Sequence, residues 1–395
     1  MTGSRHGSVD EPFDETFELA GEPTVVKDLG GRAAQASQWR LVFWKFRRHH
    51  VAVVATFVVL TLYLIGIFAE FIAPYSPQKI ETRYTYAPPQ ALSLITRDSQ
   101  GGWQFQPHVK GYTIEVDPVI LKRTFVIDSK NIIPVGLFVK GESYQLFGLI
   151  PMDRHLIGPV NPADPMFLMG TDRIGRDLFS RLVYGTRISM SIGLVGVIIS
   201  LALGILLGGL SGYYGGAVDT IIQRVIEILS SIPTIPLWMG LAAAIPLTWS
   251  PLSVYFTITL IISLIGWTAL GREVRGRFYA LRSEDFVTAA RLDGSSELRV
   301  VLRHMVPSIT SHIVASITLA IPAMILAETS LSFLGIGLKP PVVSWGVLLQ
   351  DAQNIRSVST APWLLIAPGL AVVTAVLAFN FMGDGLRDAA DPYND

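Results

Sequence analysis

The stretch ISMSIGLVGVIISLALGILLGGL, residues 188–210, runs for 23 residues without a charged side chain. A helix needs about 20 largely apolar residues to cross the hydrocarbon core of a bilayer. We therefore predict a transmembrane helix here. The whole chain agrees with this reading, because 50% of its residues are apolar and only 16% are charged. Soluble domains carry about 25% charged residues.

Five other stretches are long and apolar enough to cross a membrane. They are Val51–Ala73, Ile226–Leu247, Pro251–Leu270, Ile309–Ser330 and Trp363–Met382. Together with residues 188–210, they predict an all-α polytopic membrane protein with six transmembrane helices. Pro233 and Pro236 should kink or interrupt the third of these helices, because proline lacks a backbone N–H donor.

Composition and motifs argue against several classes of function. The formal net charge is zero, so no overall basic field suggests binding to nucleic acid. There is no cysteine, which excludes disulfides and thiolate chemistry. The sequence contains no phosphate-binding loop of the G-x-x-x-x-G-K-[ST] type, no H-E-x-x-H and no G-x-S-x-G. We therefore expect no catalytic residue, no metal site and no cofactor in this chain.

Four side chains in the connection after the first span have the residue types of a metal site: Asp153, His155, Asp164 and Asp172. They lie among prolines and glycines, where aspartate usually stabilises turns. We interpret them as turn residues.

Lysine and arginine near the ends of the spans predict the orientation. Arg40, Lys45, Arg47 and Arg48 precede the first span, and a group of seven arginines lies between residues 272 and 303. With both termini in the cytoplasm, these residues all lie inside. Residues 1–38 then form a disordered cytoplasmic tail, 39–73 the basic flank and first helix, and 74–165 an extracytoplasmic insertion.

The sequence of the insertion, residues 74–165, predicts short strands. The runs GYTIEV (111–116), RTFVID (123–128) and YQLFGLI (144–150) alternate in polarity and are bounded by turn residues. We expect a small β-rich domain between helices 1 and 2. Residues 166–187 follow as a turn and an amphipathic helix, which we expect to lie along the membrane interface.

Glycines recur at the end of the second span. Gly204, Gly208, Gly212 and Gly216 are four residues apart, a spacing that places them on one helix face. Glycine lets another backbone approach closely. We interpret them as helix-packing positions; a lining for a moving interface is the alternative.

Ionisable residues in the spans are few and lie near the ends: Glu70, Glu227 and Glu328. A carrier driven by protons or ions would place such groups deep in its spans. This pattern disfavours a secondary carrier and suggests that a partner supplies the energy. We keep Glu328 as a candidate functional residue.

The stretch FVTAARLDGSSELRVVLRHMVPS, residues 286–308, is amphipathic and basic, although apolar spans flank it. Phe286, Ala289, Ala290 and Asp293 should begin a short helix that ends at Gly294, since glycine tolerates the left-handed conformation. Ser295 or Ser296 can cap a second helix. That helix should present Leu298, Val301, Leu302 and Met305 on one side, with Arg299 and Arg303 on the other, and end at Pro307. Such a pair can lie in a partner's groove or on anionic lipid.

Residues 283–307 resemble the EAA loop of ABC-transporter permease subunits. In that loop Glu-Ala-Ala is followed by glycine four residues after the last alanine, and a hydrophobic run leads to proline. This chain has Thr288-Ala289-Ala290, then Gly294 and Pro307, so Thr288 stands where glutamate is usual. The resemblance implies that Phe286, Thr288, Ala289, Ala290, Asp293, Gly294, Leu298, Arg303 and Pro307 contact the ATPase.

More specifically, the chain is similar to the second permease subunit of dipeptide and oligopeptide importers. The similarity rests on GTDRIGRDLFSRLVYGTRIS (170–189), ETSLSFLGIGLKPPVVSWG (328–346) and APWLLIAPGLAVVTAVLAFNFMGDGLRDAADP (361–392). It covers residues 166–395 as a permease core and also the first span. The connection after that span is usually much shorter in this family, so residues 75–165 form an insertion that the resemblance does not explain.

The resemblance implies a non-catalytic permease subunit of a binding-protein-dependent importer in a bacterial inner membrane. Expected partners are a second homologous permease, two cytoplasmic ATPases that bind ATP and magnesium, an extracytoplasmic solute-binding protein and membrane lipid. Di- or oligopeptides are the expected substrate, with oligosaccharides, nickel or another small solute as alternatives. A secondary carrier and a membrane-anchored binding module are more distant alternatives. We expect the insertion to serve as a platform for the binding protein or the partner permease.

Overall fold

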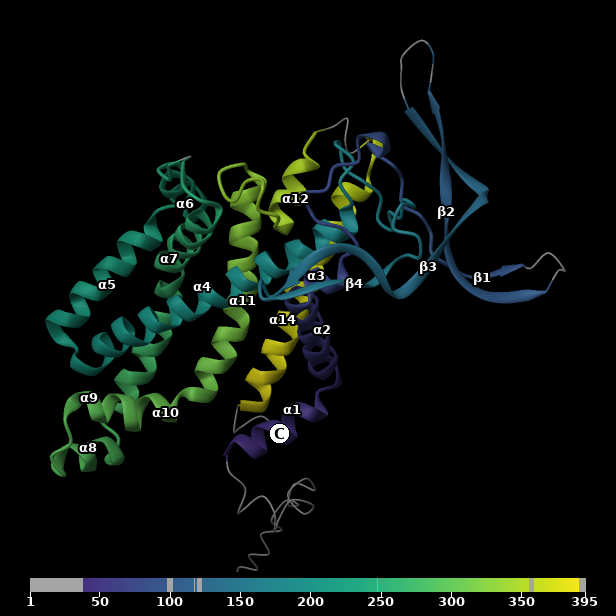
Figure 1. Cartoon of the computed structure of the whole chain (residues 1–395). Helices are drawn as coiled ribbons and strands as arrows, with labels where there is room; N and C mark the ends of the chain where they lie inside the picture. The colour runs from purple at the N-terminus through teal and green to yellow at the C-terminus, as the bar shows by residue number, and fades with distance from the viewer. Residues whose placement is uncertain are drawn as a thin grey trace, which may run out of the picture.

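The computed structural model describes residues 38–97, 102–116, 118, 123–246, 248–354 and 359–390. Its centre is a bundle of long helices, from which a β-sheet extends to one side (Figure 1). The expected tail, residues 1–38, lies outside the described part except for Gln38, and so does Leu247 of the expected third span.

The first span is broken near its end. α1 (Gln38–Arg48) is the basic flank, α2 (His50–Ile67) is wholly uncharged, and α3 (Ala69–Ile72) follows after Phe68. Arg187 fixes this end to the next span: its Nη2 lies 2.5 Å from Oε2 of Glu70, and its Nε donates to the carbonyl of Gly66 at 2.7 Å. The first span and the helix that begins at Leu178 are therefore held together at this level.

The segment between these helices contains one antiparallel sheet in the order β1-β2-β3-β4. Its strands are β1 (Ser93–Arg97), β2 (Trp103–Val116), β3 (Arg123–Leu146) and β4 (Ile150–Pro159), with a short 3₁₀ helix η1 (Thr82–Tyr84) before them. This confirms a β-rich segment between helices 1 and 2. The run 144–150 is not one strand, because Phe147 (φ +56°) and Gly148 (φ +70°) turn the chain from β3 into β4.

α4 (Leu178–Tyr214) is 37 residues long and continuous. Asp177 precedes it, and its carboxylate accepts a hydrogen bond from the Ser180 N–H at 2.8 Å and so caps the first turn. The amphipathic helix expected before residue 188 is therefore the first part of α4 and not a separate element. Because α4 crosses the whole bundle, it forms the spine against which α7 and α11 pack (Figure 1).

The expected third span is two helices. α5 (Gly216–Ser231) and α6 (Thr234–Ala243) meet at an angle of 88° at Ile232–Pro233. The predicted interruption by proline is confirmed, whereas the expected bounds Ile226–Leu247 are wrong, because α5 begins at Gly216 and α6 ends at Ala243. By length and composition the described residues contain five helices able to cross a membrane, or six if this bent pair counts as one span.

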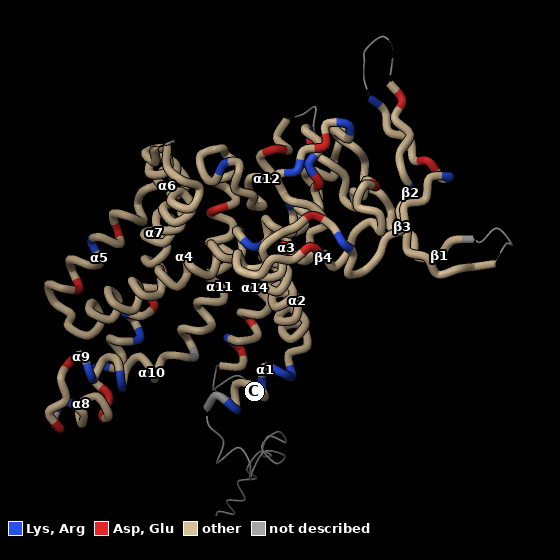
Figure 2. Tube along the Cα trace, in the orientation of Figure 1, with Lys and Arg blue, Asp and Glu red and all other residues tan. Residues whose placement is uncertain are grey.

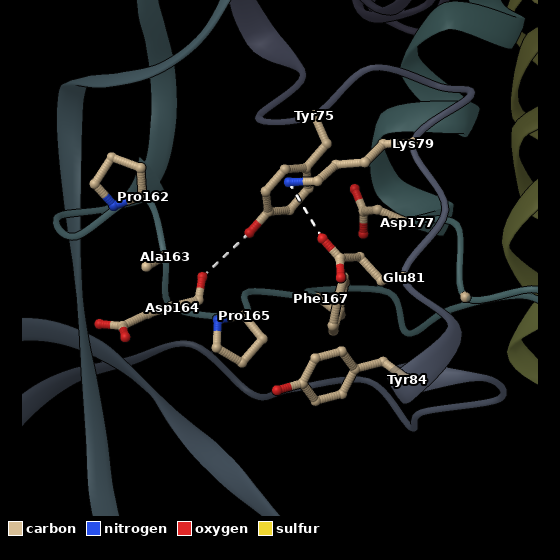
Figure 3. Close-up of a pocket in the computed structure, with 11 residues that line it drawn as sticks. Tyr75, Lys79, Glu81, Tyr84, Pro162, Ala163, Asp164, Pro165, Phe167 and Asp177 are labelled. Carbon is tan, nitrogen blue, oxygen red and sulfur yellow. Dashed lines mark hydrogen bonds and ion pairs between the residues drawn. The ribbon is translucent and has the colours of Figure 1, made fainter.

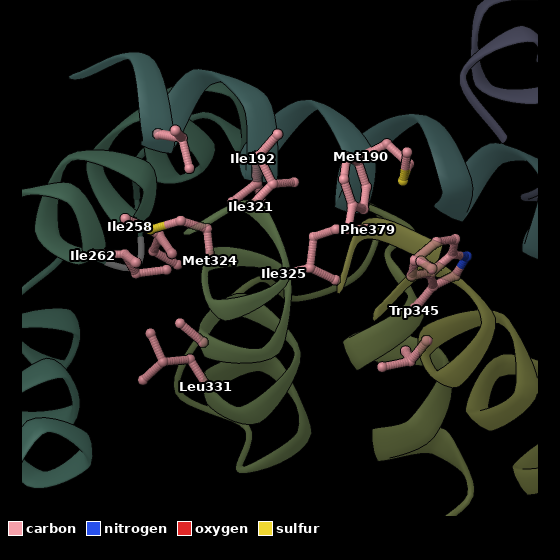
Figure 4. Close-up of a cluster of buried hydrophobic side chains, with 14 of the residues drawn as sticks. Met190, Ile192, Ile258, Ile262, Ile321, Met324, Ile325, Leu331, Trp345 and Phe379 are labelled. Atoms are coloured by element: carbon pink, nitrogen blue, oxygen red, sulfur yellow. The ribbon is translucent and has the colours of Figure 1, made fainter. Parts of the chain in front are cut away.

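The remaining helices complete the bundle. α7 (Pro251–Leu281) leads into three short helices and a π-helical turn at 285–308; α11 (Thr310–Phe333), α12 (Trp345–Asp351) and α14 (Trp363–Ala390) follow. The main core lies where α4, α7, α11, α12 and α14 meet, around Met190, Ile258, Ile325, Trp345 and Phe379 (Figure 4). Lysine, arginine, aspartate and glutamate gather toward the ends of these helices and in the connections (Figure 2).

Candidate functional site

The segment between α7 and α11 forms a compact helix pair. α8 (Asp285–Leu292) ends at Asp293, and α9 (Glu297–Val300) continues through the π-helical turn η2 (Val301–Met305) into α10 (Val306–Ser308). Gly294 takes φ +77°, and the Ser295 N–H donates to the Ala290 carbonyl at 3.1 Å. The expected break at Asp293–Gly294 is present, and it closes the end of α8 with a left-handed glycine.

The helix pair is packed firmly onto the bundle. Val287, Val300 and Met305 are fully buried. They join a core with residues at the ends of α4, α7 and α11: Tyr213, Val274, Phe278, Ile309 and Ile313. The guanidinium of Arg291 lies 4.8 Å from the centre of the Tyr213 ring, and the Tyr214 hydroxyl donates to Glu297 at 2.5 Å. The pair and the ends of these helices therefore share one buried core.

The opposite face of the pair is exposed and apolar. Leu292, Leu298 and Leu302 are 85%, 69% and 57% exposed. The expectation that Leu298, Val301, Leu302 and Met305 share one side is wrong, and Val301 packs against the core as Met305 does. Met305 points into the core, and the two leucines point away from it, because the π-helical turn advances the chain by more than 3.6 residues per turn.

Of the residues expected to contact an ATPase, only Ala290 is half-buried, and it packs against the core of the pair. The others are exposed: Phe286, Thr288, Ala289, Asp293, Gly294, Leu298, Arg303 and Pro307. Sequence reasoning missed the buried residues Val287 and Val300. Their apolar, β-branched character was a signal, but the helical phase needed to read it is interrupted at Gly294 and again at η2.

Three of the four expected packing glycines form a close contact with α7. A Cβ on Gly204 would lie 2.9 Å from the Cβ of Leu270, one on Gly208 would meet the carbonyl of Gly271, and one on Gly212 would lie 2.5 Å from the carbonyl oxygen of Arg275. Gly216 does not belong to this face. It lies beyond the end of α4 with φ +54°, and among the described residues nothing lies within 4 Å of a Cβ built there.

A cavity of about 630 Å³ opens between α6, α7, α11 and α14. Its walls are largely apolar and include Trp238, Leu270, Leu319 and Met324. One end is polar: the Ser316 hydroxyl donates to Glu273 at 2.7 Å, and Nη2 of Arg277 lies 3.3 Å from Nδ1 of His312. Arg387 of α14 lies at the same lining. The cavity combines a size suited to a small solute with charged groups of both signs.

Glu328, which the sequence places near the end of a span, is fully buried. Its carboxylate accepts hydrogen bonds from the hydroxyls of Ser344 at 2.7 Å, Ser332 at 2.8 Å and Ser189 at 3.3 Å. Each hydroxyl in turn accepts a backbone N–H, from Val347, Leu338 and Trp345 respectively. Glu328 thus ties α4, α11 and the start of α12 together. We assign it a structural role, because all of these polar groups satisfy one another.

A second, smaller pocket of about 60 Å³ lies beside the sheet (Figure 3). The Tyr75 hydroxyl points to the Asp164 carbonyl at 3.5 Å, and Lys79 Nζ lies 3.5 Å from Glu81. Burial raises the pKa of the Asp177 carboxyl, which also lines this pocket, to about 6, and nearby Asp172 acts in the same direction. The pocket is too small for a peptide.

The four candidate metal residues have other partners or roles. Asp172 pairs with Arg181 at 2.7 Å and with Arg176 at 2.6 Å. Asp153 lies 3.6 Å from Lys140, and His155 faces the carbonyls of Glu70 and Glu142 at 3.1 and 3.0 Å. The Asp164 N–H donates to the Asn161 carbonyl at 3.0 Å, as in a turn. Within the described residues, no three histidine, aspartate or glutamate side chains gather as metal ligands.

The bundle, its cavity and the attached helix pair define a multi-pass membrane protein with a solute-sized opening between its helices. Two family models match this chain. Residues 204–393 match the binding-protein-dependent transport system inner membrane component, and residues 37–89 match the N-terminal TM domain of oligopeptide transport permease C.

Relatives identify the family. The chain is 39% identical over 229 residues to the dipeptide transport system permease protein DppC of Haemophilus influenzae, covering 58% of this chain and 75% of that protein. It is 40% identical over 240 residues to the oligopeptide transport system permease protein OppC of the same organism, covering 61% of this chain and 75% of that protein. The chain belongs to the DppC/OppC-like family of permeases, the inner-membrane components of binding-protein-dependent ABC transport systems.

Among solved structures, a chain of the MetNI methionine ABC transporter in an inward-facing conformation is similar, with a TM-score of 0.40 and 16% identity. The match covers 54% of this chain and 97% of that one. This likeness is too low to add to the assignment, which rests on the family models and the two permeases.

Proposed function

We propose that this chain is one of two permease subunits in an ATP-driven importer of di- or oligopeptides. Relatives at 39% and 40% identity are named as dipeptide and oligopeptide permeases, which supports peptides over oligosaccharides or nickel. The chain itself catalyses no reaction. Its task is to form half of the pathway and to receive movement from the ATPases.

The proposed assembly has a second, homologous permease, two ATPases that bind ATP and magnesium, and a solute-binding protein. Both termini face the cytoplasm of a bacterium, and the sheet faces outward. In this arrangement residues 74–165 lie on the outer side of the membrane, and 166–395 form the permease core with the coupling loop 283–307. The basic residues of α1 and of 272–303 then lie on the cytoplasmic side, as the positive-inside rule requires.

One observation carries the proposed mechanism: the helix pair directly connects the two helices that line the polar end of the cavity. Glu273 and Arg277 belong to α7, and His312 and Ser316 belong to α11. The buried contacts of Val287, Val300 and Met305 leave little freedom between the pair and these helices. When the ATPases close on ATP, a displaced pair shifts both cavity walls, which is how access alternates between the two sides.

The cavity supplies suitable chemistry for a peptide. A peptide carries a positive amino end, a negative carboxyl end and backbone amides. Glu273 and Arg277 offer one charge of each sign, one helical turn apart on α7, and the apolar wall around Trp238 and Met324 accommodates varied side chains. Such a lining binds peptides without selecting a particular sequence.

The decisive experiment measures uptake by the reconstituted complex. Proteoliposomes that hold the chain, its co-purified partners and a binding protein should accumulate a labelled tripeptide only with ATP. Leu298→Asp should weaken recovery of the ATPases and reduce ATP-dependent uptake, since it puts a charge on the exposed apolar face of the pair. Phe105→Asp, on β2 and equally exposed, is the matched control and should leave ATPase recovery unchanged.

Two results would contradict the proposal. Accumulation of peptide by this chain alone, driven by a proton gradient without ATP, would make it a secondary carrier. ATP-dependent uptake of an oligosaccharide or nickel in place of the tripeptide would support an ATP-driven importer but contradict a peptide substrate.

A further inference from the structure

The β3–β4 hairpin, whose role neither family model covers, exposes a group of large apolar side chains. We call this group the apolar hairpin face; its members are Phe138, Phe147 and Leu149, the last of which lies in the same turn as Phe147. Leu149, at the turn, is 83% exposed. Large exposed apolar groups that lie together mark a contact with a partner or a membrane.

This face continues the outer stripe of the first span. On α2, Phe57, Leu60 and Leu64 are exposed and lie on one side, since their spacings of three and four residues repeat the helical turn. Phe68 and Phe71 extend the same side into α3. The Phe68 ring lies 5.7 Å from that of Phe147, and the Phe71 ring lies 5.8 Å from that of Phe138. The hairpin therefore extends the exposed apolar surface of the first span.

The level of the contact fits the edge of a bilayer. α2 has 18 residues, and a helix of that length is about 27 Å long. This nearly equals the hydrocarbon thickness of about 30 Å. With Arg47 and Arg48 at one boundary, Phe68 comes to the other. Glu70 and Arg187, which pair at 2.5 Å just beyond Phe68, mark the start of the polar layer.

The backbone holds the aromatic residues of this face in an uncommon conformation. Among the described residues only Tyr86, Phe138 and Phe147 have positive φ without being glycine, and the last two are the aromatic members of the face. A positive φ is an outlier for a bulky side chain and a reason to look for function. The hairpin bends in a way that directs both rings toward the end of the first span.

Polar groups lie where lipid headgroups would meet the hairpin. Lys140 is exposed beside Asp153, the Arg154 guanidinium donates to the Phe138 carbonyl at 3.0 Å, and the Tyr144 hydroxyl donates to the Arg154 carbonyl at 2.7 Å. Tyrosine, lysine and arginine are the residues that anchor proteins at the membrane–water interface. An apolar face bordered by such residues is typical of a segment that lies in the interface.

We propose that the β3–β4 hairpin inserts its apolar face into the lipid leaflet next to the end of α2. The occupant of this surface is lipid: acyl chains contact Phe147 and Leu149, and headgroup phosphates contact Lys140 and Arg154. The hairpin thereby anchors the inserted sheet against the bundle. This inference depends on α2 as a membrane span and not on the transported substrate.

Spin labelling tests the proposal directly, because the chain contains no cysteine. Leu149→Cys carries the nitroxide in full-length chain assembled with cysteine-free partners in nanodiscs. Collision rates are measured with oxygen, which concentrates in lipid, and with a water-soluble nickel chelate. Leu64→Cys on α2 is the lipid reference. Phe105→Cys on β2, 73% exposed, is the matched control for an exposed apolar site of the same sheet.

We expect the label at 149 to collide faster with oxygen than with nickel, as at 64, and the label at 105 to show the reverse. A label at 149 that behaves like the one at 105 lies in water and overturns the proposal. Slow collision with both reagents at 149 means that protein covers the face, as a partner permease would, and overturns it as well. All three sites are at least half exposed, so labelling is not expected to prevent folding.

Discussion

The helix pair 285–308 and the β3–β4 hairpin lie at opposite ends of the bundle, and both expose apolar side chains. Behind the exposed leucines of the helix pair lies a buried core shared with α4, α7 and α11, and Arg291, Arg299 and Arg303 adjoin them in the sequence. The aromatic residues of the hairpin instead extend the exposed stripe of α2. Exposure alone thus does not identify a partner. We distinguish the two by their surroundings. A buried core behind the leucines and charged residues around them favour a protein partner for the helix pair, whereas continuity with the apolar stripe of α2 favours lipid for the hairpin.

The largest expected effect on stability comes from disturbing the close contact between α4 and α7 beneath the helix pair. Gly212→Leu forces a side chain against the Arg275 carbonyl and the Cβ of Phe278, which belongs to the buried core of the pair. Because backbone cannot yield as a side chain can, we expect a loss of about 3 kcal/mol or more and a poor yield of folded chain. Thermal unfolding in detergent measures it.

The matched control is Gly276→Ala on α7, where nothing among the described residues lies within 4 Å of the added Cβ. It should be neutral or slightly stabilising, since alanine favours helix over glycine by about 1 kcal/mol. Equal stability of both variants would show that α4 and α7 do not rely on close approach.

The next effect concerns the sheet end, where Asp177 caps α4. Burial raises its pKa from 3.8 to about 6, so between these values the folded chain holds a proton that the unfolded chain has lost. Stability therefore falls as pH rises through this window, by up to about 3 kcal/mol. Asp177→Asn keeps the cap without the charge and should raise stability at pH 7 to 8.

Urea or thermal unfolding of both proteins from pH 3.5 to pH 8 checks this. The wild type should lose stability with rising pH relative to the asparagine variant. An unchanged difference between the two proteins across that range would rule out a buried, ionising carboxyl at this end.

Met305→Ala removes a fully buried side chain from the core of the helix pair. Truncations of this kind cost about 2 kcal/mol or more, because the cavity closes only in part. We expect faster hydrogen exchange in residues 285–305 and unchanged exchange in the hairpin. Equal acceleration at both ends would mean that the two regions unfold as one unit.

Gly294→Leu changes the bend itself. At φ +77° a side chain is strained by about 1 to 2 kcal/mol, while the surroundings are open. The chain should still fold, but the helix pair should contact the ATPases less closely. We therefore expect the complex to hydrolyse more ATP for each peptide imported. Full uptake with a normal ratio would remove Gly294 from coupling.

The smallest effects on stability are expected for two variants that compare the exposed face of the helix pair with the apolar hairpin face. Leu302→Ser and Leu149→Ser both alter exposed leucines, and each should change stability by less than about 0.5 kcal/mol. Leu302→Ser should weaken recovery of the ATPases from solubilised membranes, whereas Leu149→Ser should not. If the two variants lose the ATPases equally, the distinction between protein and lipid contact fails.

The sequence predicts the spans well because composition decides which segments enter lipid. The uncharged run 188–210, for example, lies wholly within α4. Prolines 233 and 236 likewise predicted the break before α6, since a missing N–H donor acts locally. The spacing of four also predicts packing positions before Gly204. Gly196 and Ser200 lie at that spacing and also face α7.

What sequence reasoning missed depends on contacts between distant residues. Glu328 looks like an end-of-span acid, and its burial follows only when serines from α4 and from the start of α12 arrive beside it. The inward direction of Met305 depends on the π-helical turn, which a pattern with period 3.6 cannot express. Gly216 shares the spacing of the packing glycines, yet the chain leaves the helix at Gly215 before reaching it.

The uninterrupted length of α4 has a mechanical consequence. A helix of 37 residues measures about 55 Å, more than a bilayer is thick, and it runs from the capped turn at Asp177 beside the sheet to Tyr213 beside the helix pair. It contains no proline. We therefore expect a displacement of the end beside the helix pair to be transmitted along the unbroken helix to the end beside the sheet, together with α7, which packs along it from Gly196 to Gly212.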